Sequence, residues 1–572
     1  MMLKDFYQYF FQNKHLLPFL LLIIIGLLLH FVWLERFPVG LSHDDAEVVL
    51  SAKTYWLFGT DTSGTSFMTS VFSNLTEGGL SGLPSILLSP IIGIFPLSLV
   101  MIRMPYVLIN IATVILLSAL INKITKDRIL SLIIFMVGLL NPWLFVYSRS
   151  PTEAPVALFF VMLGIYLFFS TQGKKIIMSS ISFVLAFYSY FGAKPVILVL
   201  LLAIPFIKKV PNRLLFLFIG LFFVGIYFVS YFSSQQGTFS ERAGKELVIS
   251  NLDRYSEIVG EQRRSSIDFP LKNFFYSKYS QLAHDVSHKA LGTLDPDFLF
   301  FSGDNPSIYR FEDHGVFYLI EFPLMIIGIF SLGKYWKKNR ELVLLISSGF
   351  VIGVIPSAVS QIGDSYFFRG FFLVPWFVVL ISLGIRLLSK YKLAIYLLSV
   401  LYFVSFVSFL SFFFFRYSVK EQENHFLSGR VMSNYLIRLP SDQKVSIVTT
   451  SPHAAYHQYL FYSNFRDANE ILFEQENYSV GNVTFYPSCD DLELNDQNIV
   501  IVDSRLNCNV TAEETPSGIY NQKDAGVQFL IYNDNLCRDV QLDSWRRFHY
   551  ISDYAIENTN KEVFCNRWVQ KI

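Results

Sequence analysis

LLPFLLLIIIGLLLHFVW, residues Leu16 to Trp33, is an apolar stretch long enough to cross a lipid bilayer as one helix. Lys4 and Lys14 precede it, so the preference for basic residues on the cytoplasmic side predicts that the residues after it lie on the outer face. His43-Asp44-Asp45 follows on that face, and carboxylates beside a membrane are costly unless they have a role. The first hypothesis is therefore a membrane enzyme that works outside the cytoplasm.

The composition excludes an ordinary soluble protein. Of the 572 residues, 52% are hydrophobic and 17% are aromatic, which is typical of a polytopic membrane protein. The formal net charge is +1 and the charged residues lie mainly between apolar runs, so no nucleic-acid partner is expected. The first apolar stretch lacks a small-residue cleavage site, and we interpret it as a retained helix rather than a signal peptide.

Apolar segments recur along the chain and predict an α-helical polytopic membrane protein with about eleven transmembrane helices. Alternate connections carry basic residues, and these connections are predicted to be cytoplasmic. The apolar segments are residues 16–36, 103–121, 129–147, 154–171, 176–191, 195–208, 213–232, 315–333, 341–358, 370–387 and 393–415. The basic connections contain Lys123, Lys126 and Arg128; Lys174 and Lys175; Lys208, Lys209 and Arg213; Lys334, Lys337, Lys338 and Arg340; and Arg386, Lys390 and Lys392.

One further apolar stretch, residues 83–97, does not fit this count. Treating it as a full span would move every basic connection to the outer face. The stretch is short and contains Pro84, Pro90 and Pro96. We therefore expect a juxtamembrane or re-entrant helix within the first outer loop.

The topology divides the chain into two predicted domains. Residues 1–415 form the transmembrane domain, with large outer loops at residues 38–102 and 233–314. Residues 416–572 form a small extracytoplasmic α/β domain. Its expected elements are a helix at residues 426–437 and strands at residues 444–449, 498–503 and 527–533.

All the cysteines lie in the C-terminal domain. Their clustering favours an oxidising compartment and two disulfides, for which the sequence allows three connectivities. Four reduced thiols remain the alternative if the surroundings do not oxidise them. The residues are Cys489, Cys508, Cys537 and Cys565.

Asp44 and Asp45, with Glu47 close by, form the first candidate site. Acidic residues are common in the first turn of a helix, and this is the structural alternative. The functional interpretation is that one aspartate acts as the general base for an acceptor hydroxyl. The group with His43 also suggests a divalent cation, but the spacing matches no metal signature, so no metal ligand is assigned.

Arg149 and Glu153 form a second candidate group, at the outer end of the third predicted span. Pro151 and Glu153 also suit an ordinary helix start, which is the structural alternative. The predicted topology nevertheless places both charges on the face that carries Asp44. Glu153 is therefore the second candidate carboxylate.

Basic side chains on the outer face form a third group. Lys194 lies in a short outer turn together with Tyr188 and Tyr190, and Arg369 lies near the outer end of the tenth span. Such cations either extend to the lipid headgroups or hold a lipid phosphate.

The run of residues 295–304 ends at Asp304 and lies in the second large outer loop. Its aromatic residues suit the membrane interface, which is the structural alternative to a role in binding.

Some motifs are absent. The sequence contains neither a G-x-x-x-x-G-K-[ST] loop nor a G-x-G-x-x-G after a strand, so an ATP-driven pump and a conventional dinucleotide fold are not supported. The predicted cytoplasmic loops are too short to bind a nucleotide sugar. Any activated donor is therefore expected to come through the membrane.

These motifs, in their order along residues 17–387, resemble the GT-C glycosyltransferases, particularly the protein-mannosyltransferase-like and aminoarabinose-transferase-like branch (family 39-like). His43-Asp44-Asp45-Ala46 resembles the acidic motif of that family's first outer loop, where many members have Asp-Glu. Arg103-Met104-Pro105 resembles its Arg-Leu-Pro. The other similar stretches are Ser148 to Glu153, Tyr188 to Lys194, and Phe298-Leu299-Phe300 to Gly303-Asp304. The C-terminal domain matches none that we can name.

The resemblance implies a GT-C-like fold and a transferase that moves a sugar from a polyprenyl phosphate to an extracytoplasmic glycan, lipid or protein, usually with inversion. Asp44 would be the general base, and Glu153 would orient the acceptor or share that role. Lys194 and Arg369 would stabilise the departing phosphate, and Arg149 would hold the acid cluster. The implied site also includes Asp45 with the acids, and Tyr188, Tyr190 and Asp304 as substrate-binding residues.

No cofactor is firmly expected, and membrane lipids are the remaining expected partners. The expected location is a prokaryotic plasma membrane, with the site on the outer face.

A transporter or flippase of lipid-linked glycans is the main alternative, because charges within spans also mark substrate pathways. That alternative predicts paired halves with interrupted helices, which the sequence does not show. An assembly scaffold would leave the outer acids and cations unexplained.

Overall fold

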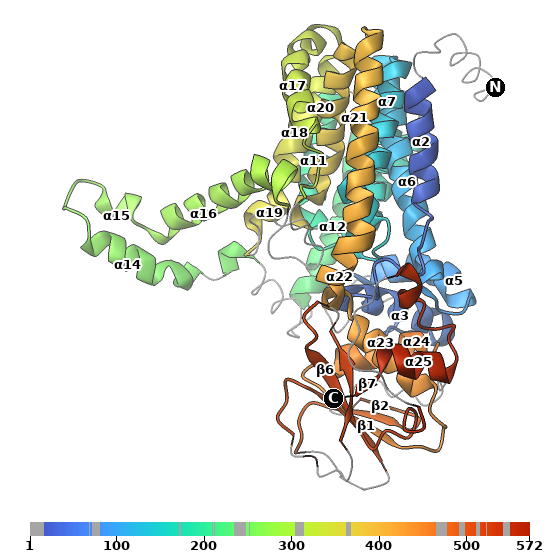
Figure 1. Ribbon diagram of the computed structural model, residues 1–572. Coiled ribbons are helices and arrows are strands. Elements are labelled where there is room, and N and C mark those ends of the chain that lie inside the picture. Colours follow the sequence, from blue (N-terminus) through green and yellow to red (C-terminus); the bar gives the residue numbers. More distant parts are fainter. Residues whose placement is uncertain are drawn as a thin grey trace.

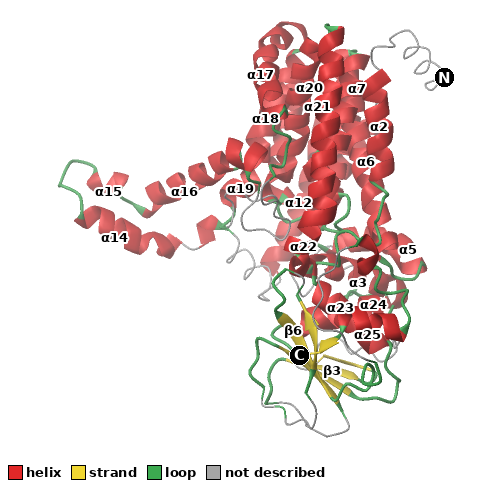
Figure 2. Ribbon diagram, in the orientation of Figure 1, coloured by secondary structure: helices red, strands yellow, loops and turns green. Residues whose placement is uncertain are grey.

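The computed structural model describes residues 17–67, 69–70, 80–170, 173–208, 210, 212–233, 247–250, 252–303, 314–361, 368–464, 478–490, 498–508, 510, 515–521, 523–540 and 550–571. A bundle of long helices adjoins a smaller domain at one end, and an arm of shorter helices projects from its side (Figure 1). Figure 2 shows the strands gathered in the smaller domain.

Each apolar segment predicted from the sequence contains a helix of the bundle. Four helical segments among the described residues are long and apolar enough to cross a membrane, namely Leu99–Thr125, Arg340–Val359, Arg369–Leu388 and Lys392–Lys420. The prediction of a helical integral membrane protein is confirmed, whereas the number of crossings and their direction stay predictions. The helices of the bundle are α2 (Leu17–Leu29), α6 (Leu99–Thr125), α7 (Arg128–Leu140), α9 (Glu153–Phe168), α10 (Gly173–Ser189), α11 (Ala193–Ile207), α12 (Arg213–Ser233), α17 (Glu321–Lys338), α18 (Arg340–Gly353), α20 (Val374–Leu388) and α21 (Lys392–Ser411).

The outward faces of α2 and α21 keep large apolar side chains exposed. Leu21 and Leu28 are exposed on α2, and Leu397 and Val404 are exposed on α21. A continuous apolar surface of this kind is unfavourable in water and suits the hydrocarbon core of a bilayer.

Several predicted segments differ from the helices in their bounds, and two of the differences have a clear local cause. The segment 315–333 becomes helical only at Glu321, whose carboxylate accepts a hydrogen bond from the backbone N–H of Tyr318 at 2.9 Å. The segment 129–147 divides at Asn141, where α7 ends and the short helix α8 (Pro142–Tyr147) begins. The Asn141 side chain accepts a hydrogen bond from the backbone N–H of Leu144 at 3.0 Å and so caps the second helix.

The two ends of the bundle differ in charge. The basic connections lie together at the end away from the smaller domain, because short connections make successive helices antiparallel (Figure 1). Arg386 contacts Asp127 from a different connection at 2.8 Å, and Lys123 is close enough to Lys175 and Lys208 to be repelled by their charges. The sequence prediction placed these basic residues on one side, and the structure brings them to one end.

Two helices lie at the opposite end, beside the smaller domain. These are α3 (His43–Phe58) and α5 (Gly82–Ile94), which pack side by side. The Ser85 hydroxyl on α5 donates to the carbonyl of Val48 on α3 at 2.9 Å. The stretch 83–97 therefore lies outside the bundle, in agreement with its expected juxtamembrane position.

The second outer loop supplies the projecting arm. Its main helices are α14 (Ser256–Arg264), α15 (Lys272–Phe275) and α16 (Lys278–Gly292), and α16 returns to the bundle near α19 (Ile355–Val359) (Figure 1). A short 3₁₀ helix, η5 (Arg369–Leu373), then leads into α20.

The C-terminal domain contains a seven-stranded mixed sheet in the order β2-β3-β1-β4-β6-β5-β7. β1 (Val445–Val448) runs parallel to β3 (Val483–Tyr486) and β4 (Ile499–Asp503), and the other pairs are antiparallel. The predicted helix and three strands correspond to α23 (Leu427–Ile437), β1, β4 and β6 (Val527–Tyr532). Further elements are β2 (Tyr478–Val480), β5 (Ser517–Tyr520), β7 (Gln570–Lys571), α24 (Pro452–Tyr462) and α25 (Lys561–Trp568).

The cysteines pair as Cys489–Cys508 and Cys537–Cys565. This pairing selects one of the three connectivities that the sequence left open. The second disulfide joins α25 to the segment after β6, and both its cysteines are buried. It therefore ties the end of the chain to the sheet.

Arg430 of α23 connects the C-terminal domain to the transmembrane domain. Its buried guanidinium donates to both carboxylate oxygens of Glu557 at 2.8 Å, to the carbonyl of Tyr554 at 3.0 Å and to the carbonyl of Val39 at 2.5 Å. Because Val39 lies between α2 and α3, one side chain holds segments from both domains. Planar guanidinium donors suit such bidentate contacts.

The Arg430–Glu557 pair predicts a pH-dependent stability. Burial alone would raise the pKa of Glu557, but the charge and hydrogen bonds of Arg430 hold that pKa below its ordinary value of 4.5. The stabilisation is therefore present above that value and is lost as the pH falls through the lower, folded-state pKa. We expect the excess in melting temperature of the wild type over Glu557→Gln to be constant from pH 7 to about pH 5 and to shrink as the pH falls from about 5 to about 3. Glu562→Gln, on an exposed residue of α25, is the control, and an excess that does not change with pH would contradict the assignment.

Candidate functional site

Two buried arginines hold the segment that leads from α2 to α3. Arg149 donates to the carbonyls of Leu29, Val32 and Phe37 at 3.0, 2.8 and 3.2 Å. Arg103 of α6 donates to the carbonyls of Leu34 and Gly40 at 2.6 Å each. Beyond α2 the segment is irregular, so most of these carbonyl groups are not paired within a helix, and the two guanidinium groups supply the hydrogen bonds that buried carbonyls require.

The C-terminal domain holds the same segment from its other side. Gln458 of α24 donates to the carbonyl of Leu41 at 3.1 Å, and Arg430 donates to that of Val39. Gly40 passes so close to the backbone of His425 that an added Cβ would lie 2.1 Å from its carbonyl oxygen. Because only glycine fits there, the start of α3 is fixed at the junction of the two domains.

The first turn of α3 gives its two aspartates different surroundings. Asp45 is buried and completes a capping box: its backbone N–H donates to the Ser42 hydroxyl at 3.2 Å, and its carboxylate accepts from the Ser42 N–H at 3.1 Å. Burial raises the pKa of Asp45 to about 6. Asp44 is only half-buried. Asp45 is thus engaged in forming the helix, and Asp44 is the better placed of the two to meet a substrate.

Glu153 lies near this acidic turn. It is buried at the first residue of α9, and its carboxylate accepts a hydrogen bond from the backbone N–H of Ser81, just before α5. Tyr106 of α6 lies close enough to interact electrostatically with both Asp45 and Glu153. Two acidic motifs that are far apart in the sequence are therefore brought together.

The predicted cations gather where α11 begins and η5 approaches it. The Arg369 guanidinium donates to the Tyr190 hydroxyl at 3.2 Å. The Lys194 ammonium lies 5.1 to 5.7 Å from the ring centres of Phe187, Phe191 and Tyr227. An ammonium group held among aromatic rings is partly shielded from water, which strengthens its interaction with an anion.

Aromatic contacts join this cationic group to the end of α8. Tyr147, the last residue of α8, packs against Phe371 with ring centres 4.5 Å apart and against Phe368 at 5.6 Å. Phe368 also contacts Tyr190 at 5.3 Å. The chain from Tyr147 to Glu153 therefore links the cations to the acids.

Two of the predicted site residues make contacts within the fold, and a third cannot be placed. Arg149 binds backbone carbonyls in place of the acid cluster, so it supports the fold of the segment that carries the acids. The Tyr188 hydroxyl donates to the carbonyl of Phe223 in α12 at 2.9 Å, which is a contact between helices. Asp304 lies outside the described residues.

Replacing Arg149 with methionine is expected to destabilise the protein by about 3 kcal/mol, because several buried carbonyls lose their donor. Thermal unfolding in detergent would show this as a lower melting temperature. Arg149→Lys should not restore stability, since an ammonium group cannot reproduce the planar array of donors. Arg128→Met, on an exposed residue at the other end of the bundle, is the control. Equal melting temperatures for Arg149→Met and the control would contradict this role.

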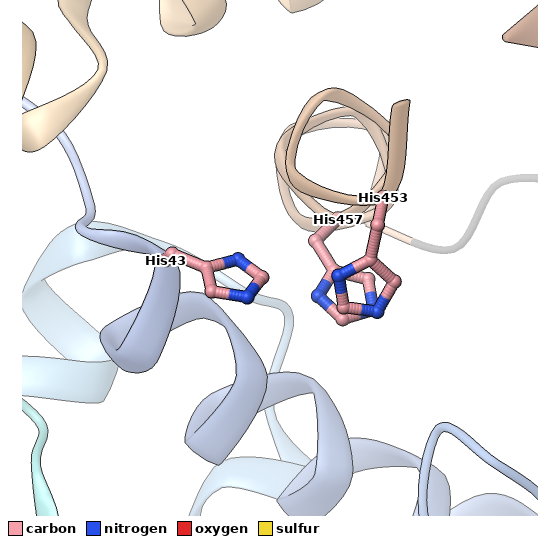
Figure 3. A group of neighbouring side chains, drawn as sticks. All are labelled: His43, His453 and His457. Carbon is pink, nitrogen blue, oxygen red and sulfur yellow. The ribbon is translucent and has the colours of Figure 1, made fainter. Parts of the chain in front are cut away.

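The structure adds two histidines that the sequence interpretation missed. His453 and His457 lie one turn apart on α24 and face His43, the first residue of α3 (Figure 3). The ring centre of His43 lies 5.1 Å from that of His453 and 6.1 Å from that of His457. The signal available in the sequence was the i, i+4 spacing of two histidines on one helix face.

The fold and the site define a class: a helical integral membrane protein whose candidate acidic and basic side chains lie at the end of the bundle that adjoins an α/β domain. No protein-family model matches the sequence. No curated protein matches it. The chain is similar in structure to ArnT from Cupriavidus metallidurans in the apo state, with 9% identity, a TM-score of 0.38, and coverage of 90% of this chain and 97% of that chain.

Proposed function

We propose that this protein is a membrane glycosyltransferase that moves a sugar from a polyprenyl-phosphate donor to an extracytoplasmic acceptor. The proposal is supported by chemically matched groups that lie at the same end of the bundle. Asp44 and Glu153 supply carboxylates there, and Lys194 and Arg369 supply cations. The other end carries the basic connections, so the candidate site faces away from the predicted cytoplasmic side.

Asp44 serves as the general base in this reaction. Its carboxylate takes the proton from the acceptor hydroxyl as the O–H bond breaks, and the acceptor oxygen bonds to the anomeric carbon of the sugar. The bond from that carbon to the phosphate oxygen breaks, and its electron pair leaves with the polyprenyl phosphate. Attack from the face opposite the leaving group inverts the anomeric carbon.

Lys194 and Arg369 stabilise the charge that develops on the departing phosphate. Cations that are fixed before the reaction and shielded from water are effective in this role. Aromatic rings surround Lys194 and hold its side chain in place. The hydrogen bond from Arg369 to the Tyr190 hydroxyl does the same for Arg369. Glu153 orients the acceptor, and its contact with the Ser81 backbone fixes its position.

The acceptor enters from the side of the C-terminal domain, because that domain contacts the segment that leads into α3. A glycan, a lipid or a protein fits this role. The proposed location is a plasma membrane with the site on its outer face, where the two disulfides of the domain are stable.

A panel of polyprenyl-phosphate sugars tests the proposal and identifies the donor. Purified protein is incubated with each donor and a cell-envelope extract, and free polyprenyl phosphate is measured. Release that depends on both one sugar and the extract is the expected result. Folded protein that releases polyprenyl phosphate from no donor, but carries a lipid-linked glycan across a proteoliposome membrane, would replace the transferase with a flippase.

A further inference from the structure

Three histidines from two domains lie together where α3 meets α24 (Figure 3). One potential ligand nitrogen from each of His43, His453 and His457 lies within 4.8 Å of the others. A tetrahedral ion with metal–nitrogen distances of about 2.1 Å needs its ligand nitrogens about 3.4 Å apart. Small rotations of the side chains therefore suffice to bring the three nitrogens around one ion.

The geometry on α24 favours ligation. His453 and His457 are four residues apart, which puts both imidazoles on the same face of the helix. Their ring centres are 3.9 Å apart. Two histidines at this spacing on a helix are a known arrangement for binding zinc, and His43 supplies the third ligand from a separate element.

The hydrogen-bonding state of the imidazoles is a second, independent observation. The Nδ1 atoms of His43 and His457 are buried and have no hydrogen-bond partner among the described residues. The whole side chain of His457 is 1% exposed. Buried polar atoms are normally satisfied, so two such atoms in one cluster indicate a missing partner.

We propose that His43, His453 and His457 bind a divalent transition-metal cation of the zinc class. Three imidazoles favour zinc over magnesium or calcium, which prefer oxygen ligands. Three protein ligands also leave a fourth position open for water or another group. The proposal does not depend on the glycosyltransferase activity.

The bound ion would join the C-terminal domain to the first turn of α3. His43 immediately precedes Asp44, so the ion would hold the main chain at the candidate base against α24. This makes the three histidines positioning residues. The segment just before His43 is held by Gln458 and Arg430, and the ion adds a further contact between the first turn of α3 and α24.

Zinc binding by the full-length protein tests the proposal. Protein whose affinity tag has been removed is treated with chelator, incubated with ZnCl₂ and desalted, and its zinc content is measured. We expect about one zinc ion per chain, retained against micromolar competitor chelator, and no comparable retention of magnesium. His43→Gln and His457→Gln should each lower the retained zinc at least about tenfold, because each removes one ligand.

His284→Gln is the matched control. His284 and His288 also lie four residues apart on a helix, but on the exposed arm, and the control should retain zinc like the wild type. Zinc should raise the melting temperature of the wild type and of the control, but not that of His43→Gln. A comparison of the metal-free melting temperatures of these proteins separates lost binding from lost folding.

A second probe reports the ligand set directly. Cobalt(II) in a tetrahedral site gives intense visible absorption bands, and we expect these bands in the wild type and their loss in His457→Gln. Wild-type protein that retains no zinc after desalting would overturn the proposal. Full zinc retention by both His43→Gln and His457→Gln would overturn it as well.

Discussion

Replacing Asp44 with asparagine is expected to lower the turnover number by a factor of about 10² to 10⁴ while leaving the fold intact. Asparagine keeps the shape of the side chain but cannot take a proton from the acceptor hydroxyl. Asp44 is half-buried and lies beside the capping box, which is formed by Ser42 and Asp45. The loss of a favourable charge at a helix start is expected to cost about 0.5 kcal/mol of stability.

The measurement is the initial rate of polyprenyl-phosphate release from the active donor, together with the melting temperature of each protein. Asp268→Asn makes the same change on the exposed arm and should leave both values unchanged. If Asp44→Asn retains a turnover number near that of the wild type, Asp44 is not the base. If it loses activity and melts at a much lower temperature, the effect belongs to folding.

Removing either predicted phosphate-binding cation is expected to lower the turnover number by about 10² to 10³. The variants are Lys194→Met and Arg369→Gln. The effect falls on the chemical step because the cations meet full negative charge only as the sugar leaves the phosphate. Arg369→Lys should retain more activity than Arg369→Gln, since it keeps the positive charge while losing the fixed contact with Tyr190.

The comparison of turnover number with KM for the donor separates this role from simple donor binding. A rise in KM with an unchanged turnover number would show that the cations only bind the donor. Lys278→Met, on the arm, and Arg128→Gln, at the opposite end of the bundle, remove positive charge elsewhere. Activity losses in these controls as large as those in Lys194→Met would show a general effect of charge.

Charge and hydropathy predicted much of the fold because both follow directly from the order of the residues along the chain. Apolar length marked the helices of the bundle, and the alternation of basic connections ordered them. The same alternation excluded the stretch 83–97 from the bundle, where α5 now lies beside α3. For the same reason, Glu153, Lys194 and Arg369 could be placed at the end that carries Asp44.

Contacts between distant segments could not be predicted in this way. Arg149 is a cation on the expected face, but its partners are carbonyls of an irregular segment more than a hundred residues away, which composition does not reveal. His453 and His457 formed a visible pair, yet the third histidine of their cluster belongs to the other domain. The parallel pairing of β1 with β3 and β4 likewise depends on tertiary contacts.

The amount of polyprenyl phosphate released for each sugar transferred tests the central claim most directly. Purified protein, one active donor and a labelled acceptor fraction are followed in time, with free polyprenyl phosphate and glycosylated acceptor measured in the same sample. The account predicts that the two products rise together in equal amounts and that Asp44→Asn slows both by the same factor of about 10² to 10⁴. Glycosylated acceptor without free polyprenyl phosphate, or movement of the intact donor across the membrane without either product, would contradict it.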